Sequence, residues 1–260
     1  MPKLTRMLSS PRSIQLGFIV LVFLAWHLLT LSGSVSPLFL PPLREVGAAL
    51  LEIIGSGSAT SEAATTLGTV LVAFVGAAVL GVTAGFGITR STYLCRLFDP
   101  LLSSIFAIPL TLFFPPFLLF FGIGPESKIA YGMTYAFFPV ALNTISGLSQ
   151  VDAKLIAAAR SMGASPGLLF RRVLLPGAAP VILTGLRVGF FVCFAAVLGG
   201  ETLSSVSGLG HQVASSAQLM DSAHLFAWIL IVIALSFGLV MLAGVLEHLR
   251  GDLRAAGDLR

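Results

Sequence analysis

The sequence is poor in charged residues and in cysteine, and it lacks the usual nucleotide-binding loops. Only 10% of its 260 residues are charged, whereas soluble domains carry about 25%, so there is too little polar surface to cover a water-soluble particle. Neither Gly-Lys-Ser/Thr nor a complete Gly-x-Gly-x-x-Gly occurs, which excludes an ATPase on this chain. The two cysteines, Cys95 and Cys193, are too few for a disulfide framework and are expected to pack as ordinary side chains.

Clustered catalytic or metal-ligating residues are also missing from the apolar stretches. A membrane-embedded enzyme needs His, Cys or acidic residues gathered inside its spans, and the sequence shows no such group. His211 and His224 have no carboxylate close by at ligand spacing, so we expect no metal site. These absences point away from an enzyme.

Long apolar runs recur along the whole chain. Hydrophobic residues make up 56% of the sequence, and the mean hydropathy is +0.99. About 20 apolar residues suffice for one bilayer crossing, and lipid-exposed backbone must satisfy its own hydrogen bonds by forming helices. The sequence therefore predicts an all-α polytopic membrane protein with about six transmembrane helices. The predicted spans are 14–31, 66–88, 97–121, 127–148, 181–203 and 223–246.

The positions of lysine and arginine predict the orientation of these spans. With the N-terminus inside, only Arg44 and Lys128 of the 15 basic residues fall outside. Both termini are therefore expected in the cytoplasm, and the positive net charge requires no nucleic-acid partner. The basic residues assigned to the cytoplasmic side are Lys3, Arg6, Arg12, Arg90, Arg96, Lys154, Arg160, Arg171, Arg172, Arg187, Arg250, Arg254 and Arg260.

The first 60 residues contain an apolar run and a shorter amphipathic segment. The basic start of the run fits a signal peptide, but Trp26 and His27 stand where small cleavage-site residues are expected, so a retained helix is favoured. The amphipathic segment either lies along the outer membrane surface or packs on neighbouring helices, and the sequence leaves both open. Its apolar residues are Leu43, Val46, Leu50, Ile53 and Ile54, with Arg44, Glu45 and Glu52 on the opposite side.

Two spans carry glycines four residues apart, Gly81 with Gly85 and Gly185 with Gly189. Small residues at this spacing let helix backbones approach closely. The pattern predicts a tightly packed helical bundle.

The third span combines proline with phenylalanine. Prolines at 109, 115 and 116 predict a kink or break, because proline cannot sit in an undisturbed helix. We expect the phenylalanines to face lipid or the core rather than to form an aromatic solute site. They are Phe106, Phe113, Phe114, Phe117, Phe120 and Phe121.

The segment between the fourth and fifth spans predicts two short helices joined by a tight turn. Asp152 is placed to cap the first helix, and Gly163 fits the left-handed position that ends it. Ser165 followed by Pro166 is a start signal for the second helix. The first helix carries an apolar stripe of Leu155, Ala158, Ala159 and Met162, and exposed arginines such as Arg160 follow. A projecting pair of short helices of this kind suits docking into a groove on a soluble partner.

This segment resembles the loop signature of bacterial ABC-importer permeases. The resemblance rests on Ala158-Ala159, on Gly163, and on Val173-Leu174-Leu175-Pro176 in register. In that family the loop is a coupling helix seated on the ATP-hydrolysing subunit. Ala157 stands where the family usually has a glutamate, so any ionic contact of that glutamate is absent here.

Further segments are similar to the sulfonate, taurine and nitrate branch of the family, and together they cover roughly residues 40–250. They are Leu40-Pro41-Pro42, Phe121-Gly122-Ile123-Gly124, Ser127-Lys128, Phe138-Pro139, Leu142-Asn143-Thr144, Leu183-Thr184-Gly185-Leu186-Arg187 and Ser207-Gly208-Leu209-Gly210.

The resemblance implies the partners and the division of the chain. It implies ATPase subunits that carry ATP and Mg, an extracytoplasmic solute-binding protein, a second permease copy, and location in a bacterial inner membrane. This chain would hold no cofactor. Residues 1–60 would form the first span and the amphipathic helix, 61–250 the core permease domain with its coupling loop at 151–176, and 251–260 a cytoplasmic tail. The solute would be a small organic anion such as a sulfonate, taurine or nitrate, although an aromatic acid or vitamin precursor stays open.

Candidate residues for the translocation path are Glu201, Asn143 and Thr144. An ionisable group inside a span is expensive and marks a functional site by default. Glu201 is equally compatible with a structural carboxylate at a helix end near Ser204 and Ser205. Asn143 and Thr144 either line the path or join helices by hydrogen bonds.

The competing function is a secondary transporter driven by an ion gradient. Such proteins often have repeated halves and several intramembrane charges. The sequence shows neither feature, and a basic helix-turn-helix loop has no obvious task in such a machine. A structural scaffold would leave the loop signature unexplained.

Overall fold

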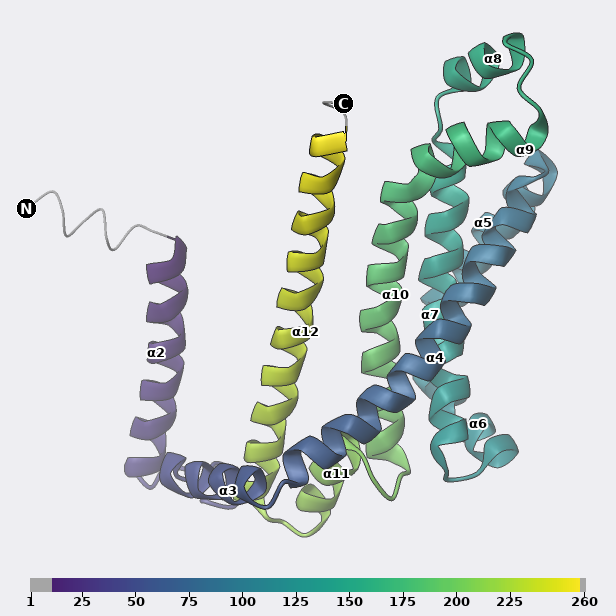
Figure 1. The fold of residues 1–260 in the computed structure, drawn as a ribbon. Coiled ribbons are helices and arrows are strands. Elements are labelled where there is room, and N and C mark those ends of the chain that lie inside the picture. The colour runs from purple at the N-terminus through teal and green to yellow at the C-terminus, as the bar shows by residue number, and fades with distance from the viewer. Residues whose placement is uncertain (1–10, 258–260) are drawn as a thin grey trace, which may run out of the picture. The chain divides into compact units, whose positions relative to one another are not determined.

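The computed structural model describes residues 11–257, and these residues form helices and connecting turns without a strand (Figure 1). The predicted all-α membrane architecture is confirmed. Lys3, Arg6 and Arg260 lie outside the described residues. The α-helices are α2 (Pro11–Leu31), α3 (Leu43–Gly55), α4 (Ser58–Thr89), α5 (Thr92–Ala107), α6 (Phe114–Phe121), α7 (Pro125–Ser149), α8 (Ala153–Ser161), α9 (Pro166–Leu169), α10 (Leu175–Leu203), α11 (Leu209–Gln218) and α12 (Ser222–Gly257), with a 3₁₀ turn η1 (Leu110–Phe113) and a π-helical turn η2 (Phe170–Leu174).

A helix is present at each of the six predicted spans. Among the described residues, three segments are long and apolar enough to cross a membrane alone: Ser58–Thr89, Pro166–Leu203 and Ser222–Val245. A fourth crossing results if α5 and the following Thr111–Phe121 segment count as one span, bent by 78°. The apolar part of α2 is shorter (Gly17–Leu31), and α7, much of which is buried in protein, is not among these segments.

The chain packs as two compact units. Of the described residues, one unit contains 11–60 and 212–241, and the other contains 61–211 and 242–257. In the first unit, the Trp26 indole N–H donates to the Pro41 carbonyl (2.9 Å), and the Trp26 and Phe226 rings meet at 4.9 Å. The Ser222 hydroxyl donates to the Leu38 carbonyl. Residues far apart in the sequence are thereby joined.

The amphipathic segment forms helix α3 as predicted. Val46, Ala49 and Ile53 are buried, which agrees with the reading that this face packs on protein.

One expectation about the histidines is wrong. His224 does have carboxylates close by, since its Nδ1 lies 2.9 Å from Asp221 and its Nε2 lies 3.7 Å from Glu52. Within residues 11–257, however, no group of three or more His, Cys, Asp or Glu side chains is placed to hold a metal ion.

In the second unit, α7 packs against both α4 and α10, and its contact with α10 is extensive (Figure 1). Both predicted glycine pairs face α7. A Cβ atom added at Gly81 would lie 2.8 Å from Val140, and one at Gly189 would lie 2.6 Å from the same valine. One at Gly85 would lie 2.6 Å from Thr144. The predicted close packing is confirmed, and the helix that packs against both glycine pairs is α7.

The predicted break in the third span is also confirmed. Helix α5 ends at Ala107, and Ile108 and Pro109 adopt non-helical backbone angles. The chain then forms η1 and α6. Pro115 and Pro116 lie in the first turn of α6, where a missing N–H costs nothing.

Replacing Gly85 with leucine should destabilise the protein by about 1–3 kcal/mol or more, because the side chain would overlap Thr144 in the α4–α7 contact. Gly87→Leu on the same helix is the matched control, since a Cβ there meets no described atom within 4 Å. Thermal unfolding in detergent measures both variants. Equal midpoints for the two would contradict the packing role of Gly85.

Candidate functional site

Glu201 is a buried carboxylate near the end of α10. Its side chain is only 3% exposed. The Thr66 hydroxyl of α4 lies 2.9 and 3.0 Å from its two oxygens, and the Gly210 backbone N–H donates to Oε2 at 2.9 Å. These partners differ from Ser204 and Ser205, which the sequence suggested as neighbours. Glu201 therefore joins α10 to α4 and to the start of α11.

Three successive backbone N–H groups at the start of α11 meet side chains of α4 and α10. Gly208 donates to Glu62 (2.6 Å), Leu209 donates to the Thr66 hydroxyl (2.9 Å), and Gly210 donates to Glu201. These donors belong to the first turn of a helix, where the backbone has no internal partner and the dipole favours negative charge. The glutamates and the threonine thus supply what this turn lacks.

The glycines of this turn are required by the carboxylate. Gly208 has φ +100°, a region that favours glycine. A Cβ atom at Gly208 would lie 2.4 Å from the Glu201 carboxyl carbon, and one at Gly210 would lie 2.4 Å from the Leu198 carbonyl oxygen and 2.7 Å from the Glu201 Cβ. Both glycines are therefore explained by close approach of this backbone to the end of α10.

Lys128, which the sequence assigned to the outer side of the membrane, is the second buried ionisable side chain of this region. The side chain is 1% exposed, in the first turn of α7. Its ammonium donates to the carbonyls of Ile123 and Gly124, the latter at 3.1 Å. The amine thereby holds the turn between α6 and α7.

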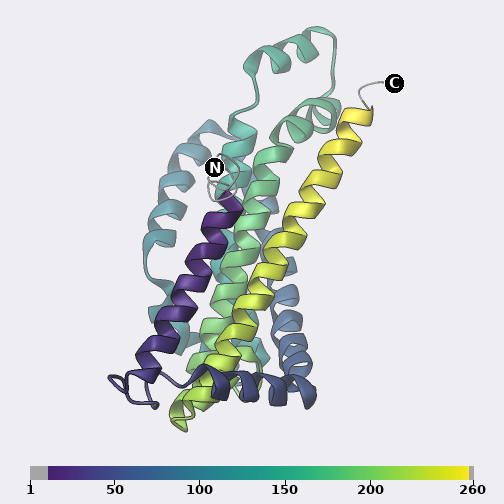
Figure 2. The ribbon, with the colours of Figure 1, turned by 90° about the vertical axis from the view of Figure 1, so that its left-hand side faces the viewer.

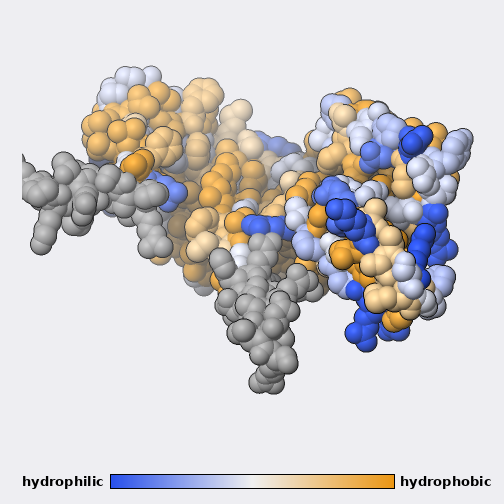
Figure 3. Space-filling model, turned by 90° about the horizontal axis from the view of Figure 1, so that it is seen from above, coloured by the Kyte–Doolittle hydropathy of each residue, from blue (hydrophilic) through white to orange (hydrophobic). Residues whose placement is uncertain are grey.

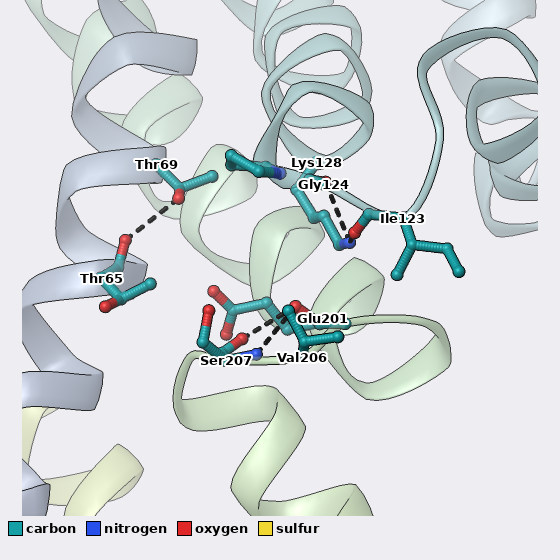
Figure 4. Close-up of a pocket in the computed structure, with 10 residues that line it drawn as sticks. Thr65, Thr69, Ile123, Gly124, Lys128, Glu201, Val206 and Ser207 are labelled. Carbon is teal, nitrogen blue, oxygen red and sulfur yellow. Dashed lines mark hydrogen bonds between the residues drawn. The ribbon is translucent and has the colours of Figure 1, made fainter.

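Lys128 and Glu201 line one small pocket, opposite Thr65 and Thr69 of α4 (Figure 4). Its volume of about 80 Å³ is enough for a few water molecules. Burial of a lone charge costs several kcal/mol, but no buried side-chain nitrogen or oxygen of the described residues lacks a hydrogen-bond partner. Glu201, Glu62 and Thr66 thus join α10 and α4 to the start of α11, and Lys128, on the other side of the pocket, bonds to the turn before α7.

The other two path candidates lie along the middle and later part of α7. The Asn143 amide donates to the Pro139 carbonyl (2.8 Å), and the Thr144 hydroxyl donates to the Val140 carbonyl (2.7 Å). Thr144 is fully buried against Gly85, and Asn143 is half-buried against Gly185. They do not meet Glu201, and their contacts are those of helix packing.

The predicted coupling loop lies at the opposite end of this unit from Glu201, and α8 projects beyond α7 and α10 in both views (Figures 1 and 2). The predicted helix caps and the predicted left-handed glycine are present in this loop. Asp152 accepts the Lys154 N–H (2.8 Å), and Ser165 accepts the Leu168 N–H (3.3 Å). Gly163 has φ +78°.

The apolar stripe of α8 is divided between the protein and its surface. Ala159 is buried, whereas Leu155, Ala158 and Met162 are exposed, with exposed fractions of 58% for Leu155 and 81% for Met162. Arg160 is exposed beside them. Three apolar residues therefore remain available to a partner.

The second half of the loop is not the separate short helix that the sequence predicted. Helix α9 passes through the π-helical turn η2 into α10, so that Pro166–Leu203 forms one continuous helical segment. Pro176 lies inside this segment, directly after the π turn that interrupts the regular hydrogen-bond pattern. Arg187, which was assigned to the cytoplasmic side, lies well inside α10. The turn η2, which joins the loop to α10, is a single π-helical turn, and such turns are frequent at functional sites.

A groove of about 380 Å³ separates α8 from η2. Its lining includes Met162, Gly163, Leu168 and Arg172. Seen from this end, much of the hydrophilic surface gathers over the loop region, on the right of Figure 3. The loop thus combines apolar side chains with basic ones.

Sequence reasoning missed Thr66, Glu62 and Lys128. Glu62 and Thr66 are four residues apart and so share one face of α4, which was an available signal. Lys128 lay inside the bounds of a predicted span, and a lysine there was itself a sign of a buried partner. Their meeting with Glu201 depends on contacts across the bundle.

The sequence is similar to those of known transport proteins. Residues 77–250 match the family of binding-protein-dependent transport system inner membrane components. The chain is 30% identical to the taurine transport system permease protein TauC of Escherichia coli, over 88% of the chain and 86% of TauC. It is 32% identical to the putative aliphatic sulfonates transport permease protein SsuC of Bacillus subtilis, over 79% and 75%. It is 29% identical to the glycine betaine/proline betaine permease ProW of Escherichia coli, over 94% of the chain and 65% of ProW.

Replacing Glu201 with glutamine should lower stability by about 1–3 kcal/mol, because the new amide nitrogen cannot accept the hydrogen bonds of Thr66 and Gly210. Glu45→Gln, at an exposed position of α3, is the control and should leave the unfolding midpoint unchanged. Thermal unfolding of the purified protein checks this. A Glu201→Gln protein as stable as the control would mean that the network is not structural.

Proposed function

Since the chain belongs to the family of binding-protein-dependent transport system inner membrane components, we propose that it is the permease subunit of an ATP-driven importer for a small organic anion. The observation that carries the coupling role is the α8–η2 loop, which presents Leu155, Met162 and Arg160 beyond the bundle. ATP and Mg would bind to a separate ATPase subunit. A solute-binding protein would deliver the solute from the opposite side, and a second copy of this chain would complete the path.

The continuity of α9, η2 and α10 supports a mechanism for coupling. A partner that moves α8 and α9 would act directly on the helix that carries Glu201. Phe170 in η2 also packs against Phe86 of α4, with ring centroids 5.0 Å apart. Displacement of the loop would therefore reach both helices that flank α7. In this proposal the helix bundle has two arrangements, and ATP binding to the ATPase shifts the equilibrium between them. Both termini of the chain would lie on the side of the membrane where the ATPase binds.

The solute class is proposed from the relatives. TauC and SsuC are named for taurine and aliphatic sulfonates, which favours a sulfonate over nitrate. Similarity to ProW makes a betaine the second candidate. Glu201, Asn143 and Thr144 stay path candidates, and the hydrogen bonds of Glu201 support a role in holding the bundle end together as well.

Replacing Gly163 with valine should abolish or strongly reduce recovery of the ATPase, because a β-branched residue disfavours φ +78° and would reshape the turn after α8. Tagged protein is purified from its native membrane in mild detergent, and its partners are identified by mass spectrometry. Gly167→Val is the matched control, since Gly167 lies in the same loop without a positive φ. Wild type without an ATPase would favour a gradient-driven transporter, and an intact complex with Gly163→Val would contradict the docking role.

Uptake of taurine by Glu201→Gln separates the two roles of this residue. If Glu201 takes part in the path, the variant that still assembles with its ATPase should transport at least about tenfold more slowly, equivalent to about 1.4 kcal/mol in the barrier. Unchanged uptake by an assembled variant would leave only the structural role.

A further inference from the structure

The break between α5 and α6 places irregular backbone inside a broken span. Helix α5 ends at Ala107, Ile108 is extended, and Pro109 has ψ 91°. The last carbonyls of a helix have no intrahelical donor. At membrane depth such backbone is tolerated only where protein covers it or where it lines a water-filled cavity.

A cleft of about 410 Å³ lies at this break. Residues 106–109 form one side, Tyr131 and Tyr135 of α7 form another, and α10 contributes the small side chains of Ala195, Ala196 and Gly199. The two tyrosine rings lie 5.0 Å apart. The small residues of α10 leave the space that a larger residue would fill.

The chemistry of the cleft suits the uncharged part of an organic molecule. Its walls are mostly apolar, and its polar side chains are Thr111, Tyr131 and Tyr135. None of the described residues that line it is charged. Apolar walls with a few hydroxyl groups are typical of small-molecule sites. Tyr131 is only 2% exposed, so a bound molecule would meet the hydroxyls of the exposed Thr111 and the half-buried Tyr135. A lipid tail has no hydrogen-bond partner to offer these hydroxyls or the backbone of the break.

We propose that this cleft is a water-accessible subsite of the translocation path, which binds the alkyl or aromatic body of an organic anion. The anionic group would remain in the aqueous path, since the cleft has no cation to pair with it. The subsite rests on the proposed transport function, and it places Phe106, expected from sequence to be core or lipid-facing, in its wall.

Thiol labelling in native membranes tests the proposal. Ala195→Cys places a thiol at an exposed position in the cleft, and Val79→Cys, at an exposed position of α4 outside it, is the control. Cys95 is first replaced by serine, whereas Cys193 is fully buried and is kept. Thiolates form only where water reaches them. A charged methanethiosulfonate reagent should therefore modify Ala195→Cys at least about tenfold faster than Val79→Cys in at least one of two conditions, the absence or the presence of ATP.

Protection then tests what the cleft binds. Pentanesulfonate and benzenesulfonate should slow the labelling of Ala195→Cys, and sulfate, which lacks an apolar body, should not. A cysteine that is unreactive in both nucleotide states would mean that lipid or a second copy covers the cleft, and this would overturn the proposal. Equal protection by sulfate, or none by any anion, would overturn the assigned ligand class. Recovery of the ATPase with the Ala195→Cys protein separates failure of this subsite from failure of the importer function.

Discussion

The close approach of α7 to α4 and α10 is the contact on which the buried group around Glu201 and the α8–η2 loop both depend. Between helices in a bilayer there is no hydrophobic driving force, so association relies on van der Waals packing and hydrogen bonds. Glycines at 81 and 85 of α4 and at 185 and 189 of α10 allow this packing from two sides, and Val140 is touched by both helices. The charge cluster lies at one end of these three helices, and the coupling loop lies at the other.

Glu201 and Lys128, with the backbone groups that they bind, form the charge cluster, and their hydrogen bonds fix two turns of the chain. Glu201 and Lys128 would each be costly alone in a membrane protein. Glu201 is instead bonded to the turn that starts α11, and Lys128 to the turn that precedes α7. Thr66 connects the first of these turns to α4, because its hydroxyl donates to Glu201 and accepts from Leu209. The cost of burial is thus offset by backbone groups that also needed partners.

The two ends of the bundle differ in a way that fits a coupled transporter. The cluster end is held by side chains and backbone amides from several segments, whereas the loop end exposes Leu155 and Met162 and joins α10 through a π turn. A rigid helix with one held end and one exposed end transmits displacement along its length. The break between α5 and α6 adds irregular backbone beside the same helix, next to the cleft that we propose as a subsite.

Much of this protein was determined by the sequence alone, because the signals concerned are local or compositional. Low charge and long apolar runs predicted membrane helices, Pro109 indicated a break, and Asp152 and Gly163 delimited α8. Only the tertiary structure decided that Lys128 is buried, that Thr66 and Gly210 are the partners of Glu201, and that α9 continues into α10. Those facts depend on which helices lie side by side, and one sequence carries no direct record of contacts between residues as distant as Thr66 and Glu201.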